Sequence, residues 1–286
     1  MRVLLVACVV IAAAVGAAQP GAGTGGTVVA FWRETPWPSI WAVRPDGSQL
    51  HRILGNRQNA KRPRLSPDRR WVAFDGSPPG KAPLSDFDIQ LVRLDGSGRR
   101  TLTRSQLWDT DAQWSPDGKL LSFTRTHRSE WQHAWIWTIR PDGTGLRRLA
   151  RGQFGRWSPD GSRVVLDAPT RDSAGDLFVV DVATGKRRLL LGSPELDQPA
   201  AWSPDGRRIL FTRFTDDSGR RTDVYVVDAD GGGLRRLGPG IAAGWSPDGS
   251  KILYADGYPG PISVMNRDGS KRRAIPNAVG ADPSWR

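Results

Sequence analysis

Hydrophobic positions along this chain recur in short runs that are separated by turn-forming residues. Each run follows a Ser-Pro-Asp segment, and a large apolar residue stands seven positions after the proline, at Phe74, Phe123, Leu166, Phe211 and Tyr254. Short apolar runs bounded by proline, aspartate and glycine are typical of β-strands. The pattern therefore predicts many short strands joined by tight turns.

The segment Trp-Ser-Pro-Asp-Gly occurs four times, beginning at Trp114, Trp157, Trp202 and Trp245. A degraded copy covers 65–69, and Trp285 stands at the end of the chain. Successive tryptophans are separated by 43, 45, 43 and 40 residues, which is the length of one four-stranded propeller blade. Within the segment, proline and aspartate suit the middle of a turn, and glycine accepts the positive φ that closes a hairpin.

A second tight turn closes each repeat, at 45–47, 94–96, 141–143, 183–185, 229–231 and 267–269. Each repeat is thus expected to contain four strands, with a variable loop between the second and the third. Five repeats begin near residues 61, 111, 153, 199 and 242. The sixth is split, because residues 28–31 match a second strand and residues 282–286 supply the first.

These repeats predict an all-β fold. We expect a six-bladed β-propeller of four-stranded blades over residues 27–286, with the ring closed by the C-terminal strand pairing into the N-terminal blade. Closure removes the unpaired strand edges that an open ring would leave.

Residues 1–18 have the pattern of a signal peptide. Arg2 precedes thirteen apolar residues at 3–15, and small residues follow. The apolar stretch is too short to span a bilayer comfortably, so we expect no transmembrane helix in the mature chain and a secreted or periplasmic location. Residues 19–26 form a glycine-rich, flexible lead-in. The segment ending at Cys8 resembles a lipobox, but only seven residues precede this sole cysteine, so we favour ordinary secretion over lipid anchoring.

The segments 109–118 and 225–237 resemble the Trp-Ser-Pro-Asp-Gly propeller repeats of the TolB family, which are shared with the propellers of dipeptidyl-peptidase-like enzymes. The resemblance covers essentially all of 27–286. It implies the fold and leaves the function open, because these repeats serve many partners. TolB adds an α/β domain before its propeller, and we find no counterpart of that domain in this sequence. We therefore expect a likeness to the propeller alone and carry over no role in a Tol–Pal complex.

Candidate catalytic groups are few, and we predict no catalytic residue, cofactor or metal. No serine has glycine two positions away on both sides, as a hydrolase nucleophile elbow requires. His127 and His133 flank a loop containing Glu130 and could bind a metal or act as acid and base, but their spacing matches no metal motif. Asp109 and Asp111 precede an inner strand and could face the mouth of the central channel. This segment has too few oxygen ligands to form a calcium-binding loop.

The basic charge is distributed in phase with the repeats. The chain carries 41 basic and 29 acidic residues, a formal charge of +12. Arginine pairs follow the second tight turn at 99–100, 147–148, 187–188, 235–236 and 272–273. Charge on an exposed edge strand prevents edge-to-edge pairing, so we predict no nucleic-acid partner. Weak, salt-sensitive binding to anionic envelope polymers or lipid headgroups remains an alternative.

Several aromatic residues have no equivalent in the repeats. Of the 13 tryptophans, Trp37, Trp108 and Trp131 fall in or beside variable loops, which gather on one face of a propeller. We therefore predict an exported, monomeric, non-enzymatic propeller that binds a protein or peptide partner in the envelope through this loop-rich face. The candidate binding residues are Trp37, Trp108, Asp109, Asp111, His127, Trp131 and His133. The alternative is a carbohydrate-binding or carbohydrate-active propeller of the cell envelope, in which tryptophan stacks on a sugar ring.

Overall fold

The structure, a computed structural model, consists almost entirely of β-strands. It describes residues 27–33, 38–55, 59–77, 86–127, 130–171, 173–216, 219 and 221–285. The predicted signal peptide at 1–18 and lead-in at 19–26 lie outside these residues. Within them, no helix has the length and apolar character needed to cross a membrane.

Four sheets have the four-stranded form that the repeat predicts. The first contains β4 (Lys61–Leu65), β5 (Trp71–Gly76), β6 (Asp88–Arg93) and β7 (Arg100–Thr101). The second contains β8 (Trp108–Trp114), β9 (Leu121–Thr126), β10 (Trp135–Ile139) and β11 (Arg147–Arg151), with the 3-10 helix η1 (Trp131–His133) before β10. The third contains β12 (Gln153–Trp157), β13 (Arg163–Ala168), β14 (Asp176–Asp181) and β15 (Arg187–Leu191). The fourth contains β16 (Leu196–Trp202), β17 (Arg208–Phe214), β18 (Thr222–Asp228) and β19 (Arg235–Pro239).

The remaining strands form one seven-stranded sheet, in the order β20-β21-β22-β23-β1-β2-β3. Its members are β20 (Ile241–Trp245), β21 (Lys251–Ala255), β22 (Gly260–Asn266), β23 (Arg273–Trp285), β1 (Val29–Arg33), β2 (Ser39–Val43) and β3 (His51–Leu54). The prediction of six separate four-stranded blades is therefore not confirmed. The physical reason is the length of β23, whose 13 residues pair with β22 at Arg273 and with β1 at Trp285, so that no break divides the sheet.

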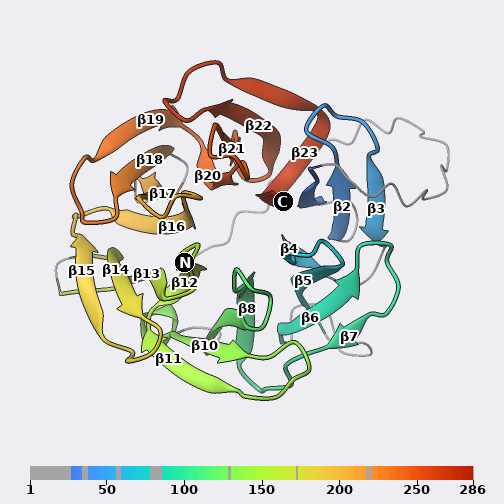
Figure 1. The fold of residues 1–286 in the computed structure, drawn as a ribbon, viewed down its shortest axis with the longest axis horizontal. Helices are drawn as coiled ribbons and strands as arrows, with labels where there is room; N and C mark the ends of the chain where they lie inside the picture. The colour runs from blue at the N-terminus through green and yellow to red at the C-terminus, as the bar shows by residue number, and fades with distance from the viewer. Residues whose placement is uncertain are drawn as a thin grey trace.

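The sheets stand around a central axis like the blades of a propeller (Figure 1). The strands nearest the axis are β4, β8, β12, β16 and β20, and the strands at the rim are β3, β7, β11, β15 and β19. Neighbouring strands in each sheet run antiparallel, so connections alternate between the two faces of the ring. The tight turns gather on one side, which we call the turn face, and the longer connections gather on the other, the loop-rich face.

The Ser-Pro-Asp turns close as their chemistry predicts. In each turn the serine Oγ donates to the carboxylate two residues later, for example from Ser158 to Asp160 at 2.6 Å. The glycine that ends the turn has a positive φ, +73° at Gly161. Successive turns also touch, because a Cβ added at Gly161 would lie 3.7 Å from Pro116 of the preceding sheet. The turns therefore form a packed ring around one end of the axis.

The repeat tryptophans join neighbouring sheets. The indole Nε1 of Trp114 donates to the carbonyl of Arg64 at 3.0 Å, and that of Trp202 donates to the carbonyl of Arg156 at 3.0 Å. The residues seven positions after each motif proline are all buried in the core between sheets. The periodic apolar positions thus form the interfaces that hold the ring together.

The arginine pairs at the rim also bridge sheets. One guanidinium of a pair donates to a carbonyl in the next sheet, from Arg147 to Val182 at 3.0 Å and from Arg188 to Ala229 at 2.5 Å. Arg100 and Arg235 do the same. These arginines are engaged within the fold, which supports a structural origin for part of the basic charge.

Candidate functional site

An aromatic cluster lies on the loop-rich face, where β8 begins. The rings of Trp108 and Trp131 meet edge to face, with centroids 6.0 Å apart, and Phe87 meets Trp108 in the same way at 5.3 Å. Both tryptophans are half-buried, whereas Phe87 is buried. This edge-to-face arrangement is a preferred geometry for aromatic pairs. Two of the three predicted loop tryptophans therefore come together, and Trp37 lies outside the described residues.

The two candidate histidines are exposed beside this cluster. His133 lies in η1, and its Nδ1 is 3.4 Å from a carboxylate oxygen of Glu130. His127 directly follows β9 and is also exposed. No three metal-ligating side chains come together anywhere in the described ranges. The loop thus presents polar, solvated groups rather than a buried acid–base pair.

Asp109 is held inside its own sheet. Its buried carboxylate accepts two hydrogen bonds from Arg125 on β9, at 2.6 Å from Nε and 2.8 Å from Nη2. The same bidentate pair occurs two sheets further on, between Asp197 and Arg213. The repetition indicates that the pair stabilises the sheet, and the Asp109 oxygens are already occupied.

Asp111 joins three inner strands beside the axis. It lies at a bulge in β8 with φ +55°, and its carboxylate is 2.5 Å from Nη1 of Arg156 on β12 and 3.5 Å from Nη2 of Arg64 on β4. Its own N–H donates to Asp75 at 2.8 Å, and Asp75 pairs with Arg62 at 3.0 Å. Buried arginine and carboxylate groups thus satisfy one another along the channel wall.

Sequence reasoning missed this network. The available signal was a repeat position, because Arg62 and Asp111 stand three residues before Leu65 and Trp114, the residues that precede a Ser-Pro-Asp segment. Asp282 of β23 occupies the same position before Trp285 and continues the network, because its carbonyl accepts from Nη1 of Arg64 at 3.0 Å. Its carboxylate accepts from the Trp32 indole at 2.8 Å and from the Tyr258 hydroxyl at 2.9 Å. Tyr258, 53% exposed on the β21–β22 connection, brings a second aromatic group to the loop-rich face.

A hydrogen bond between sheets that recurs at three places is missing at Asp167. In the second strand of a repeat, the residue after the large apolar residue can accept a hydrogen bond from a backbone N–H of the inner strand in the next sheet. Asp75 accepts from Asp111 in this way, Thr124 accepts from Phe154, and Thr212 accepts from Ala242. At Asp167 the corresponding donor position is Pro199, which has no N–H.

The carboxyl of Asp167 is consequently incompletely bonded. Its Oδ2 accepts from Gln153 Nε2 at 3.0 Å, while Asp167 Oδ1 and Gln153 Oε1 have no partner. Burial raises the pKa of Asp167 to about 8, because the charged form loses its hydration. Burial also raises the pKa of Asp75 to about 6, against the opposing effect of Arg62. Asp167 is therefore mostly protonated at neutral pH.

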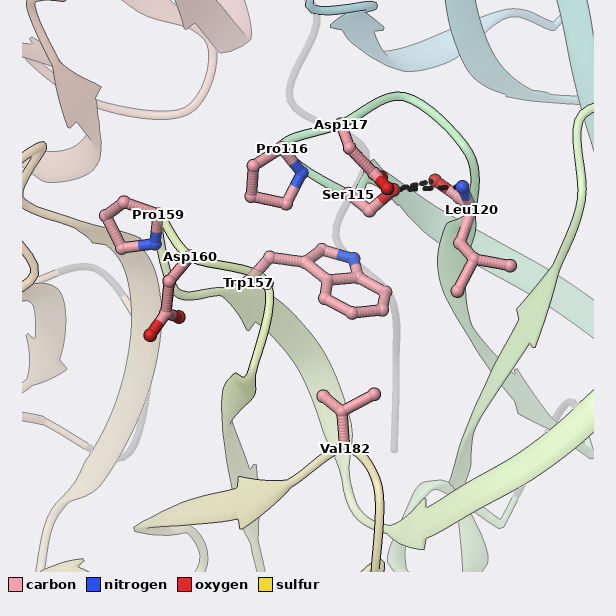
Figure 2. A pocket seen from close by; sticks show the side chains of 9 residues that line it. Ser115, Pro116, Asp117, Leu120, Trp157, Pro159, Asp160 and Val182 are labelled. Carbon is pink, nitrogen blue, oxygen red and sulfur yellow. Dashed lines mark hydrogen bonds between the residues drawn. The ribbon is translucent and has the colours of Figure 1, made fainter.

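A pocket of about 430 Å³ opens on the turn face between the second and third sheets. Figure 2 shows the indole of Trp157 in the middle, with Leu120 on one side, Pro116 and Pro159 on the other, and Val182 pointing toward it. Asp117 and Asp160 also belong to the lining, and the Asp160 carboxylate points away from the Trp157 indole (Figure 2). No candidate residue from the sequence lies here.

Comparisons with known proteins agree with this architecture. Residues 151–285 match the family model described as the TolB beta propeller domain. The protein TolB homolog of Chlorobium luteolum is 25% identical over 168 residues, covering 57% of this chain and 36% of the relative. The crystal structure of TolB from Acinetobacter baumannii superposes with a TM-score of 0.75 at 23% identity, covering 91% of this chain and 66% of that one. The predicted TolB-like resemblance is confirmed.

Enzymes are also among the similar proteins. Dipeptidyl-peptidase 5 of Porphyromonas endodontalis is 30% identical over 109 residues, which cover 36% of this chain and 15% of the enzyme. The alignments span at most 36% of the length of the first curated relatives. The shared region is propeller, so these likenesses bear on the fold.

Proposed function

Starting from its TolB-like propeller, we propose that this chain is an exported, non-enzymatic protein that binds a protein or peptide partner through its loop-rich face. The observation that carries the proposal is the Trp108–Trp131 pair. Large aromatic side chains that are half-buried on a rigid scaffold are favoured anchors for a partner, since they bury much apolar area at little cost in side-chain entropy.

The surroundings of the pair suit recognition. Trp131 is carried by η1 in a long connection, whereas Trp108 begins an inner strand that the Asp109–Arg125 pair holds in place. One tryptophan of the pair thus stands on a connection and the other on a strand of the scaffold, an arrangement typical of recognition sites. Exposed Glu130 and His133 supply a polar rim.

The decisive experiment is capture of partners from an envelope extract by the mature protein with and without Trp131→Ala. We expect the variant to lose its specific partner while its thermal unfolding stays unchanged, because Trp131 is not a core residue. Trp285→Phe, at a repeat position away from the loops, is the matched control and should retain capture. Unaltered capture by Trp131→Ala would contradict the proposed site.

We further infer six blades, a closed ring and a monomeric state. The seven-stranded sheet is interpreted as two blades that share β23, which pairs with both β22 and β1. In a ring closed in this way every sheet packs between two neighbours and only short edges remain, so it does not need a second copy to cover a sheet. Export rests on the signal-peptide pattern of residues 1–18, and a mass spectrum of the mature protein would test both cleavage and lipidation.

The alternative is a carbohydrate-binding or carbohydrate-active propeller. One similar structure is an oligogalacturonate lyase in complex with manganese, with a TM-score of 0.56 at 14% identity. Here the oxygens of Asp109 and Asp111 are engaged by arginines, which disfavours their use on a sugar or a metal. Binding or cleavage on a glycan panel would favour this alternative.

A further inference from the structure

The pocket at Trp157, which we call the turn-face pocket, exists because of one short side chain. The position six residues after the residue that precedes each Ser-Pro-Asp segment carries a long side chain in four repeats, at Trp71, Arg163, Arg208 and Lys251. Arg163 reaches the next sheet, whereas Arg208 pairs with Asp228 and Lys251 donates to Asn266 within their own sheets. In the remaining repeat this position is Leu120, which lines the pocket beside Trp157.

The neighbouring interface shows what can fill this space. The guanidinium of Arg163 lies 4.9 Å from the ring centroid of Trp202, the next repeat tryptophan. Trp202 is only 6% exposed, and Trp114 and Trp245 are similarly buried at 6% and 8%. Trp157, which has Leu120 in place of an arginine, is instead half-buried. The pocket is therefore an arginine-sized space over an accessible indole.

The charges around the pocket are suited to a cation. Asp117 and Asp160 belong to the lining, and each is held by its turn serine, which lowers the pKa of both carboxyls, to about 2 for Asp160. Both side chains are therefore ionised at neutral pH. Lys119 is the cation nearest Asp117, at 3.7 Å, but this is an exposed pair of the kind that contributes little.

We propose that the turn-face pocket binds the guanidinium group of an arginine side chain presented by a partner polypeptide. The planar cation stacks on Trp157, as Arg163 stacks on Trp202, and the two aspartates balance its charge. Arginine suits this site better than lysine, since it is more weakly hydrated and stacks on an aromatic face. The site lies on the face opposite the aromatic cluster and does not depend on the function proposed above.

The test uses short peptides and fluorine NMR of the fluorotryptophan-labelled protein, with Trp157→Phe to assign the signal. N-acetyl-Gly-Arg-Gly-amide should shift the Trp157 resonance. The same peptide with citrulline, which is neutral and nearly the same shape, should bind about tenfold more weakly. Equal affinity for the citrulline peptide, or for one carrying norleucine, would overturn the proposal because the pocket would then select shape or apolar surface.

Two variants check the origin of the pocket. Leu120→Arg should fill it from within, abolish binding of the arginine peptide and leave the folding temperature unchanged or higher. Arg163→Leu should open an equivalent space over Trp202 and add a second peptide-responsive tryptophan signal. Undiminished binding to folded Leu120→Arg would overturn the proposal, while the loop-face capture experiment would be unaffected by either result. Lys251→Arg, at the same repeat position elsewhere, is the matched control and should bind as the wild type does.

Discussion

Gln153 donates from Nε2 to Oδ2 of Asp167 over 3.0 Å, and leaves Oδ1 of the same buried carboxyl without a partner. The unpaired Gln153 Oε1 can only accept, so between these two atoms a proton on the Asp167 carboxyl is the donor that would pair them. A carboxyl that is neutral when folded and ionised when unfolded makes stability depend on pH.

The sign of that dependence follows from the raised pKa. Asp167 has a pKa of about 8 when folded, against 3.8 for an ordinary aspartate, so the folded state binds more protons between these values. Its contribution to the free energy of unfolding is therefore present below about pH 4 and is lost as the pH rises toward 8. Asp75, with a pKa of about 6, acts in the same direction over a narrower range.

Asp167→Asn should remove this dependence. An amide can donate to Gln153 Oε1 and accept from Nε2 at every pH, and it carries no charge to desolvate. We expect the variant to gain at least about 1 kcal/mol over wild type in urea unfolding at about pH 9, and much less at about pH 5. Asp197→Asn, which breaks the pair with Arg213, is the control and should destabilise at both pH values. A variant that loses stability equally at both pH values would contradict our assignment.

Arg125→Met should destabilise the protein by about 3 kcal/mol, since it leaves the Asp109 carboxylate buried without its partner. Chemical unfolding measures the effect. Arg208→Met removes an exposed pair with Asp228 and should cost less than about 1 kcal/mol. Similar losses in the two variants would show that burial does not govern the Asp109 pair.

Substitutions at two glycines of the second tight turn distinguish the cost of backbone strain from the cost of a steric clash. Gly143 and Gly231 have φ of +93° and +102°, but an added Cβ meets nothing within 4 Å at Gly143 and lies 2.6 Å from the Leu190 carbonyl at Gly231. Gly143→Ala should cost about 1 kcal/mol. Gly231→Ala should cost more than about 2 kcal/mol, because the neighbouring sheet must also move. Thermal unfolding of both variants measures the difference, which vanishes if the sheets are not in close contact there.

Arg188→Ala should lower the free energy of unfolding by about 1 kcal/mol through loss of its bond to the Ala229 carbonyl. Arg207→Ala, an exposed position on a tight turn, is the charge-matched control and should be nearly neutral. Binding to anionic vesicles should change equally in both variants, because each removes one surface charge. A stability loss shared by both variants would argue that net charge, rather than the bridge between sheets, is responsible.

Local chemistry made most of the fold predictable. The strands and both tight turns follow from residues that are close in the sequence: Ser158 bonds Asp160 within one turn, and Gly161 adopts its positive φ there. The repeat also identifies Trp157 as a repeat residue. Its exposure was not predictable, because it depends on Leu120 of the preceding sheet.

The period, the hairpins, the arginine pairs and the aromatic character of the loops are each encoded within a few residues, so they can be read from the chain. Which groups meet across sheets depends on the folded ring. It joined Trp108 to Trp131, enclosed Asp109 with Arg125, placed Pro199 where Asp167 needed a donor, and let β23 pair with two partners. These outcomes depend on contacts between segments that are distant in the chain, which a periodic sequence pattern does not specify.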